Sequence, residues 1–379
     1  MLKVCEFYSG IGGMHFALER SGVPHQVIAA FDVNDVANKV YAHNFPGVKI
    51  HPRLLESQPA SFFAKLGADV WVMSPPCQPY TRQGNQLGSE DRRANSFLHL
   101  IEVIGELGAK GPSMVLVENV YGFEKSHTRD ALVIKLKQCG YEFREFMLTP
   151  LQFGVPNSRL RYYLVAWRSK DVSVIEHSED STLEVEVPPL DLLTTIPGMD
   201  RILPLADVEH IRDKSSSSPS ASQRQLPSSI APVSDYLIPI SETDLERYRI
   251  AERVLEKTGY AFDIVSSLSQ RTCCFTKGYF HYVEGTGSIL RTDSESAPLA
   301  LPLPRDKLRY FHEYEIAALM GFPTTAMNSN NSGNVEGGER HVLKFPEDIT
   351  QKQRYRLLGN SLSVLVVSHL LKFVYSKAK

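Results

Sequence analysis

A chain of 379 residues, of which 42% are apolar and 22% charged, can bury one large core and has room for a smaller second module. Its formal net charge of -2 argues against a protein that coats nucleic acid through a large positive field, so local basic clusters would have to carry such binding. The five cysteines are odd in number and form no Cys-x-x-Cys pair, which argues against a disulfide framework and a zinc site.

The start of the chain shows no basic region followed by an apolar one, and no apolar run approaches the roughly 18 residues that span a bilayer. We therefore expect a soluble intracellular protein that binds neither a membrane nor a metal. As separate expectations, the protein is a monomer and is found in the cytoplasm and nucleus. In such a reducing compartment, any special cysteine would be a free thiol.

Short β-branched runs alternate with helical stretches over the first part of the chain, the pattern of a parallel sheet covered by helices. The expected strands are residues 3–7, 27–31, 70–73, 114–117 and 162–166. The expected helices are residues 13–20, 35–44, 96–107 and 129–139, and Gly140 ends the last of them. We predict a doubly wound, mostly parallel, Rossmann-like α/β sheet within a catalytic domain of residues 1–180.

The composition changes after this domain. Residues 213–235 are rich in Ser and Pro and are predicted to be disordered, and a polar insertion at about 324–345 is predicted to be mobile. We expect a second, smaller region at 181–305, with a compact stretch at 238–290. Residues 306–379 are expected to return to the catalytic domain, with a helical segment at 314–320 and a final apolar helix or strand at 361–375.

A glycine-rich turn follows the first expected strand. It runs from Phe7 to Gly13, and Asp32 ends the second strand 20 residues after Gly12. In an open parallel sheet these positions face one crevice, where glycines let a ligand approach and a carboxylate can bind a ribose. His15 stands where a dinucleotide site needs a third glycine, so S-adenosylmethionine, which has a ribose but no phosphate, fits better. A tight strand-to-helix connection without a ligand is the alternative.

The fourth strand leads into Ser74-Pro75-Pro76-Cys77-Gln78-Pro79, a loop stiffened by three prolines. This loop would hold the thiol of Cys77 in a fixed position at the carboxyl edge of the sheet, as a nucleophile requires. A buried structural cysteine is the alternative, but a proline-rich segment is a poor core element. The site would have to lower the thiol pKa, because a free thiol is only a few per cent thiolate near neutral pH.

The fifth strand delivers Glu118 and Asn119 to the same edge of the sheet. If the fourth and fifth strands are neighbours, Glu118 lies within reach of whatever Cys77 attacks. A thiol beside a carboxyl group suits attack on a pyrimidine, because carbon 6 of cytosine is a poor electrophile unless N3 is protonated or hydrogen-bonded. A merely solvated glutamate at a strand end is the alternative.

Arg159 and Arg161 precede the last expected strand of this domain. Their period-2 spacing predicts both guanidinium groups on one face of that strand. There they could hold the pyrimidine O2, orient Glu118 or clamp a phosphate. An edge strand blunted by charge is the alternative.

Six sequence blocks, in this order along nearly the whole chain, resemble those of the cytosine-C5 methyltransferases. They are Phe7 to Gly13, Pro75-Pro76-Cys77-Gln78, Glu118-Asn119-Val120, Arg159-Leu160-Arg161, Arg309 to Pro323 and Gly359-Asn360-Ser361. Within that family, the runs Arg271 to Tyr279 and Glu284 to Ser288 are similar to the small eukaryotic branch that methylates tRNA-aspartate.

This resemblance implies that Cys77 adds to carbon 6, Glu118 contacts N3 and the exocyclic amine, and Arg159 and Arg161 support the base. The implied S-adenosylmethionine site comprises Phe7, Ser9, Gly10, Ile11, Gly12, Gly13, Asp32, Val33, Leu55, Glu56, Ser74, Asn360 and Ser361. The implied contacts to tRNA comprise Gln78, Asn119, Cys274, Phe275, Thr276 and Lys277. Residues 181–305 would then recognise the target, and the target cytosine would lie in the anticodon loop, where bases are already unstacked.

Three other functions remain open at this point. A DNA cytosine-C5 methyltransferase would use the same chemistry on a different nucleic acid. A nicotinamide-dependent oxidoreductase could use Gly10, Gly12 and Asp32, although the missing third glycine and the Pro-Pro-Cys-Gln loop count against it. A catalytically inactive nucleic-acid-binding homologue could keep the fold, although all four candidate catalytic side chains are present.

Overall fold

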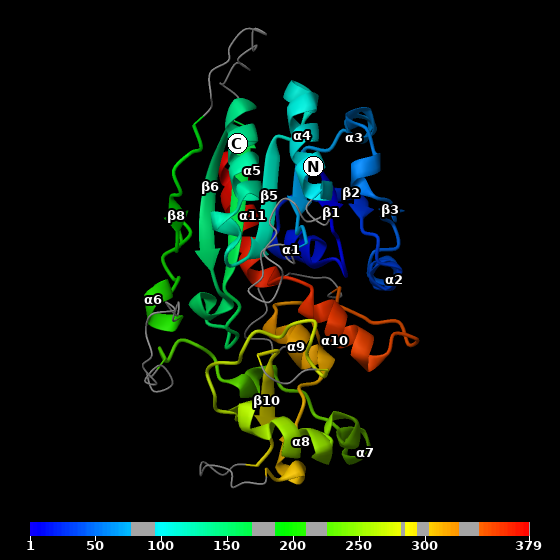
Figure 1. Cartoon of the computed structure of the whole chain (residues 1–379), viewed down its shortest axis with the longest axis vertical. Coiled ribbons are helices and arrows are strands. Elements are labelled where there is room, and N and C mark those ends of the chain that lie inside the picture. Colours follow the sequence, from blue (N-terminus) through cyan, green and yellow to red (C-terminus); the bar gives the residue numbers. More distant parts are fainter. Residues whose placement is uncertain are drawn as a thin grey trace. The chain divides into compact units, whose positions relative to one another are not determined.

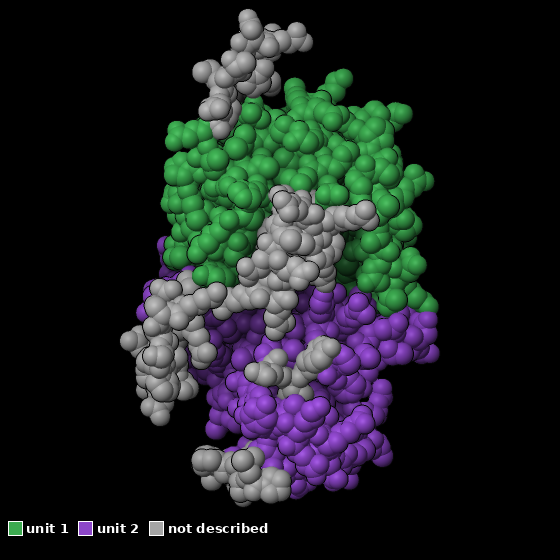
Figure 2. All heavy atoms as spheres, viewed as in Figure 1, with its two compact units in different colours: residues 1–148, 160–199, 367–379 green, residues 149–159, 200–366 purple. Residues whose placement is uncertain are grey.

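A computed structural model describes residues 1–76, 95–168, 186–209, 226–281, 285–293, 303–325 and 341–378 of the chain (Figure 1). These residues form two compact units, coloured separately in Figure 2. Unit 1 comprises Met1–Leu148, Leu160–Met199 and Val367–Lys379, and unit 2 comprises Thr149–Arg159 and Asp200–Val366.

Unit 1 contains an eight-stranded sheet with the strand order β3-β2-β1-β4-β5-β7-β6-β8. The strands are β1 (Leu2–Phe7), β2 (His25–Phe31), β3 (Ile50–His51), β4 (Val70–Met73), β5 (Met114–Val120), β6 (Tyr141–Leu148), β7 (Arg161–Arg168) and β8 (Leu192–Leu193). Strands β3, β2, β1, β4 and β5 pair in parallel, β7 is antiparallel to both β5 and β6, and β8 is parallel to β6. The predicted mostly parallel α/β sheet is confirmed.

Helices connect these strands and cover both faces of the sheet. They are α1 (Gly13–Ser21), α2 (Asp35–Asn44), α3 (Ala60–Leu66), α4 (Asn95–Leu107), α5 (His127–Gln138) and the greater part of α11 (Val364–Lys377), with short 3-10 turns at Leu55–Ser57, Gly108–Lys110 and Phe123–Lys125. Helices α4 and α5 lie side by side (Figure 1). Phe373 of α11 contacts Trp167, whereas Arg129 of α5 binds Glu145, which lies on the opposite face of the sheet.

Unit 2 holds a three-stranded sheet with the order β11-β10-β9, surrounded by short helices. The strands are β9 (Asp263–Val265), β10 (Ser288–Arg291) and β11 (Leu308–Arg309), and the helices are α6 (Leu205–Val208), α7 (Glu242–Leu245), α8 (Glu252–Thr258), α9 (Glu313–Leu319) and α10 (Gln351–Gly359). The 3-10 turns are Pro150–Phe153, Val233–Tyr236, Glu246–Tyr248, Gly259–Ala261 and Arg305–Lys307. Arg309 and Glu315, both buried, join β11 to α9 through two 2.8 Å hydrogen bonds.

The two units divide the chain differently from the predicted domains. Residues 149–159, expected in the catalytic domain, belong to unit 2 because Gln152 and Leu203 exchange two backbone and side-chain hydrogen bonds of 3.0 Å. Residues 306–366, expected to return to the catalytic domain, also belong to unit 2, since β11 pairs with β10. Among the described residues, the chain returns to unit 1 only from Val367 onward.

The structure describes part of each predicted insertion. Residues 213–225 and 326–340 lie outside the described residues, but 226–235 and 341–345 are ordered parts of unit 2. Ile230 packs with Leu151 and Val208 in a buried apolar cluster, and Leu343 is also buried. The prediction of disorder for 226–235 and of mobility for 341–345 is therefore wrong, because a few apolar side chains anchor each segment.

One helical stretch corrects the expectation that the chain lacks a membrane-length apolar run. The stretch Gln351–Lys377, which includes α10 and α11, has 27 residues and is apolar enough by composition to cross a bilayer. However, 67% of its most apolar window is buried inside the protein. Such burial is typical of a core helix, whose apolar face packs on the rest of the fold.

Candidate active site

The carboxyl ends of four neighbouring strands are in register along one edge of the sheet in unit 1. Strand pairing aligns the last residues of β2, β1 and β4 with the middle of β5, in the row Phe31, Phe7, Met73, Val117. The next residue on each strand is therefore Asp32, Tyr8, Ser74 and Glu118. In parallel sheets this edge is where ligands bind, so the register itself places the predicted cofactor and catalytic residues side by side.

The turn after β1 has an unusual backbone. Tyr8, Gly10 and Gly12 have φ angles of 56°, 52° and 87°, all in the left-handed region. The amide of Gly12 donates to the carbonyl of Ser9 at 2.8 Å, which closes the turn immediately before α1. Three such residues within five positions fold the chain back sharply and expose backbone at the sheet edge.

Glycine is favoured at positions 10 and 12 of this turn for different physical reasons. A Cβ atom on Gly10 would meet no atom within 4 Å, so a ligand can approach the backbone there. A Cβ atom on Gly12 would lie 2.5 Å from Cε2 of Phe45 and 3.3 Å from Tyr41, so packing beneath the turn requires glycine. The other predicted residues of this turn are buried: Phe7, Ser9, Ile11 and Gly13.

Asp32 connects the end of β2 to this turn. Its Oδ2 accepts the amide of Gly10 at 2.8 Å and its Oδ1 accepts the amide of Asn34 at 2.8 Å. Burial raises the pKa of Asp32. The backbone of Val33 also hydrogen-bonds to this carboxylate, so one of its roughly four acceptor positions remains for a ribose hydroxyl. The neighbouring Val33 side chain is 62% exposed and offers an apolar surface next to that carboxylate.

The two predicted cofactor residues after β3 differ in exposure. Leu55 is buried in the core of unit 1, whereas Glu56 is exposed. Leu54 is the apolar side chain that reaches the surface here, with 58% of it exposed.

The end of β4 is bonded to the turn and to β5. Ser74 donates its amide to the carbonyl of Phe7 at 3.4 Å and its hydroxyl to the carbonyl of Tyr8 at 3.2 Å. Asn119 donates its side-chain amide to the carbonyl of Pro75 at 3.5 Å. The predicted neighbourhood of the fourth and fifth strands is confirmed. Cys77 and Gln78 lie outside the described residues, so their predicted roles remain predictions.

Glu118 is buried at the end of β5 and pairs with a cation. Only 8% of it is exposed, and Nε of Arg161 lies 3.7 Å from its Oε1. In the antiparallel pairing of β5 and β7, Glu118 is opposite Tyr163, so Arg161 lies diagonally across on the same face of the sheet. This contact is compatible with the suggestion that Arg161 orients Glu118, which remains a prediction.

Arg159 does not share that face, and the prediction of two guanidinium groups on one strand face is wrong. Strand β7 begins at Arg161, and Arg159 belongs to unit 2. Its buried guanidinium donates to the carbonyl of Phe275 at 3.2 Å, to Sγ of Cys274 at 3.4 Å and to the carbonyl of Ser361. Arg159 therefore joins three segments of unit 2 that are distant in sequence.

The predicted tRNA-contacting run in unit 2 packs tightly against the end of α10. A Cβ atom on Gly359 would lie 2.1 Å from the backbone of Thr276, so only glycine permits this approach. Phe275 is buried against Tyr279 and Phe311, so its side chain is part of the core rather than a substrate contact. Lys277 and Asn360 are exposed, and Cys274, Thr276 and Ser361 are partly exposed.

A family model described as "C-5 cytosine-specific DNA methylase" matches residues 2–376. The chain belongs to the cytosine-C5 methyltransferase family. It is 39% identical to a human protein named tRNA (cytosine(38)-C(5))-methyltransferase, over 99% of each chain. It is also 35% identical to a Dictyostelium discoideum protein named DNA (cytosine-5)-methyltransferase, over 99% of this chain and 94% of that protein. A crystal structure of a Spodoptera frugiperda DNMT2 mutant superimposes with a TM-score of 0.72 at 33% identity, over 99% of this chain and 100% of that one.

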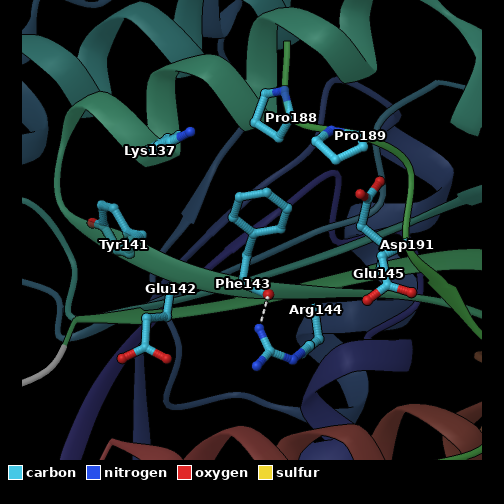
Figure 3. A pocket seen from close by; sticks show the side chains of 9 residues that line it. All are labelled: Lys137, Tyr141, Glu142, Phe143, Arg144, Glu145, Pro188, Pro189 and Asp191. Atoms are coloured by element: carbon cyan, nitrogen blue, oxygen red, sulfur yellow. Dashed lines mark hydrogen bonds between the residues drawn. The ribbon is translucent and has the colours of Figure 1, made fainter. Parts of the chain in front are cut away.

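A separate hollow of about 320 Å³ lies at the outer edge of the same sheet (Figure 3). It is lined by Lys137, Tyr141, Glu142, Phe143, Arg144, Glu145, Pro188, Pro189 and Asp191. The ring of Phe143 points toward Pro188, and Arg144 turns back to donate to the carbonyl of Phe143 at 2.8 Å. Tyr141 pairs with Arg168, at the far end of β7 from Arg161, so this hollow is not the methyltransferase site.

Glu6 and Tyr41, a hydrogen-bonded pair beneath the turn after β1, are not predicted by the sequence analysis. Glu6 is fully buried in β1, and its Oε2 accepts the hydroxyl of Tyr41 at 2.9 Å. That hydroxyl also lies 3.0 Å from Nδ1 of His15, whose ring stacks on Phe45. The only signal in the sequence was a glutamate next to the apolar residues of β1, and a glutamate alone does not reveal its partners.

Replacing Glu6 with glutamine should make stability less dependent on pH. Burial raises the pKa of Glu6 from 4.5 to about 8, and the bond from Tyr41 offsets this only in part. Below pH 4.5 both states hold the proton, so Glu6 contributes nothing. Between pH 4.5 and 8 the unfolded chain releases the proton that the folded chain keeps, so stability falls as pH rises.

Urea unfolding at a series of pH values tests this prediction. Relative to the wild type, Glu6→Gln should gain stability steadily from pH 4.5 to 8, by a total of roughly a few kcal/mol. Glu19→Gln, an exposed site on α1, is the control and should follow the wild-type curve. Parallel curves for the wild type and Glu6→Gln would show that Glu6 does not carry a raised pKa.

Proposed function

We propose that this methyltransferase transfers the methyl group of S-adenosylmethionine to carbon 5 of a cytosine in the anticodon loop of tRNA, with tRNA-Asp as its substrate. The proposal rests on the register of the strands. This register aligns three features along one sheet edge: the turn after β1 (Tyr8–Gly12, the cofactor turn), Ser74 and Glu118. Along this edge, Glu118 is a buried carboxyl group paired with Arg161, and Ser74 begins the segment that leads to Cys77.

The residues of the turn fit S-adenosylmethionine. Gly10 leaves space over the backbone, Asp32 retains an acceptor position for a ribose hydroxyl, and Val33 offers an apolar surface for the adenine. The strand order reverses between β1 and β4, and this is the point in a doubly wound sheet where nucleoside ligands bind. When bound, the cofactor supplies an electrophilic methyl group on its sulfonium.

The proposed chemistry divides between a sulfur and a carboxyl group. The Cys77 thiolate forms a bond to carbon 6 of the cytosine while Glu118, in its protonated form, gives its proton to N3, so that carbon 5 becomes nucleophilic. Carbon 5 then gains the methyl group with release of S-adenosylhomocysteine. A base removes the proton from carbon 5, the bond between Cys77 and carbon 6 breaks, and the N3 proton returns to Glu118. In this proposal, Arg161 keeps the Glu118 carboxyl group oriented toward the cytosine ring.

RNA is favoured as the substrate by the unstacked bases of the anticodon loop and by the names of the relatives. A cytosine can enter such a pocket only when it leaves its stack, and a tRNA anticodon loop presents bases that are already unstacked. The human relative, similar over the whole chain, is named for cytosine 38 of tRNA. The name of the Dictyostelium relative keeps duplex DNA as a second candidate.

Methyl transfer to competing substrates tests the proposal. With labelled S-adenosylmethionine, a tRNA-Asp transcript should accept label at least ten times faster than duplex DNA, because the duplex must first lose the stacking and pairing of one base, which costs about a few kcal/mol. The matched control is the same transcript with uridine at the target position, which should remain unlabelled. Faster labelling of DNA than of tRNA would show that DNA is the substrate. A protein that binds NADH but does not bind S-adenosylhomocysteine would contradict the methyltransferase function itself.

A further inference from the structure

We infer that Tyr8 is a positioning residue that couples occupation of the cofactor turn to the first turn of helix α4. The inference rests on the proposed function, because it assumes that the turn after β1 binds the cofactor. It gives the turn a second role besides binding the cofactor, namely to hold the start of α4 at Asn95. The hydrogen bond between the hydroxyl groups of Tyr8 and Ser96 is the proposed link.

The backbone of Tyr8 is the first indication. Its φ angle of 56° lies in the left-handed region, where a residue with a Cβ atom is strained. Among the described residues, Phe280 is the other non-glycine residue with a positive φ. Glycine would relieve the strain at position 8, as it does at Gly10 and Gly12, so the surrounding structure must hold the tyrosine side chain in place.

The side chain of Tyr8 supplies the contact. Its hydroxyl donates to Oγ of Ser96 at 3.0 Å, across 88 residues of sequence, and the bond is partly buried. Ser96 lies in the first turn of α4, which begins at Asn95. The bond therefore joins the cofactor turn directly to this helix end.

The carbonyl of Tyr8 makes a third connection. It accepts the hydroxyl of Ser74 at 3.2 Å, at the end of β4 and three residues before Cys77. Tyr8 thus contacts the described residues on both sides of the segment 77–94, and it sits one residue before Ser9 and two before Gly10 in the turn. A ligand that fixes the turn must also fix Tyr8, and by thermodynamic reciprocity a fixed Ser96 must raise the affinity for that ligand.

Removing the two hydroxyl groups singly and together tests the coupling. We would measure S-adenosylhomocysteine affinity by calorimetry for Tyr8→Phe, Ser96→Ala and the double variant. Loss of one modest hydrogen bond predicts roughly 3- to 10-fold weaker binding in each single variant. Because both substitutions break the same bond, the double variant should bind no more weakly than the weaker single variant. Tyr141→Phe, which removes a hydroxyl that donates to the carbonyl of Pro112 elsewhere in unit 1, should bind as the wild type does.

Hydrogen exchange of α4 provides a readout that a merely structural role would not move. In the wild type, S-adenosylhomocysteine should slow amide exchange in the first turn of α4 several-fold, and in Tyr8→Phe this ligand-dependent slowing should disappear. Equal slowing in both proteins, or binding losses that add in the double variant, would overturn the coupling. Failure of the wild type to bind S-adenosylhomocysteine at all would instead overturn the proposed function, so the two failures can be told apart.

Discussion

Cys77→Ala is expected to lower methylation of tRNA by about 10⁴-fold or more, because the reaction loses its covalent step. Without a sulfur on carbon 6, carbon 5 of cytosine remains part of an aromatic ring that does not attack a methyl donor. Binding of S-adenosylhomocysteine should stay within about twofold of the wild-type value, since the cofactor contacts proposed above lie on other residues. Single-turnover labelling of tRNA-Asp measures the first effect and calorimetry the second.

Cys139→Ala is the matched control for this experiment. Cys139 lies at the end of α5, and burial raises the pKa of its thiol, so it is a poor nucleophile. The control should retain wild-type activity. If Cys77→Ala kept more than a few per cent of the wild-type rate while Cys139→Ala lost activity, the nucleophile would have been assigned to the wrong cysteine.

Glu118→Gln should lower the rate of methyl transfer by about 10² to 10⁴-fold, the range expected when a proton-transfer group is removed. Glutamine keeps the size of the side chain and can still donate a hydrogen bond, but it cannot give a proton to N3. The substitution also removes the charge that faces Arg161 at 3.7 Å. The loss should therefore fall on kcat, with the affinity for S-adenosylhomocysteine nearly unchanged.

Glu142→Gln, an exposed site on β6, controls for the loss of a carboxylate from the same sheet and should be fully active. Comparison with Arg161→Lys would separate the two parts of the pair. Lysine keeps the positive charge but lacks the planar fork of arginine, so it should lower kcat less than Glu118→Gln does. A Glu118→Gln enzyme with normal kcat would show that N3 is activated by another group.

The sheet that positions the site could be predicted from the sequence. A parallel strand that is buried on both faces appears as a continuous apolar run, and Val70–Met73 is such a run in which every residue is buried. Pro75 and Pro76 follow this run, and Glu118 follows the next apolar run, Met114 to Val117. These residues mark where each strand ends and therefore which side chains lie at the ligand-binding edge. The register of β2, β1, β4 and β5 agrees with the predicted positions of Asp32, Ser74 and Glu118 at one edge of the sheet.

Other elements depend on contacts that are distant in sequence. Strand β6 has the sequence YEFREFML, and its Glu145 is buried only because Arg129 on α5 binds it at 2.8 Å and Tyr162 on β7 binds it at 2.7 Å. The sequence pattern of a charged strand does not reveal such partners. We did not predict this strand for that reason, although its position between β7 and β8 completes the sheet.

The roles of the two arginines show the same limit. Their spacing predicts one face only if both residues lie within a strand, and the strand boundary is set by tertiary contacts of Arg159 with Phe275 and Ser361. Likewise, Ile230 and Val233 order part of a Ser- and Pro-rich segment because Leu151 and Val208, far away in sequence, form a buried cluster with Ile230. Composition alone underestimates such anchoring.

Covalent trapping on tRNA-Asp that contains 5-fluorocytidine at the target position tests the central claim most directly. Fluorine on carbon 5 cannot leave as a proton does, so the bond between Cys77 and carbon 6 should persist after methyl transfer. We expect the wild type with S-adenosylmethionine to form an RNA adduct that survives denaturing electrophoresis, with the crosslinked peptide containing Cys77, and Cys77→Ala to form none. An adduct of equal yield with Cys77→Ala, or one mapped to another residue, would contradict the account.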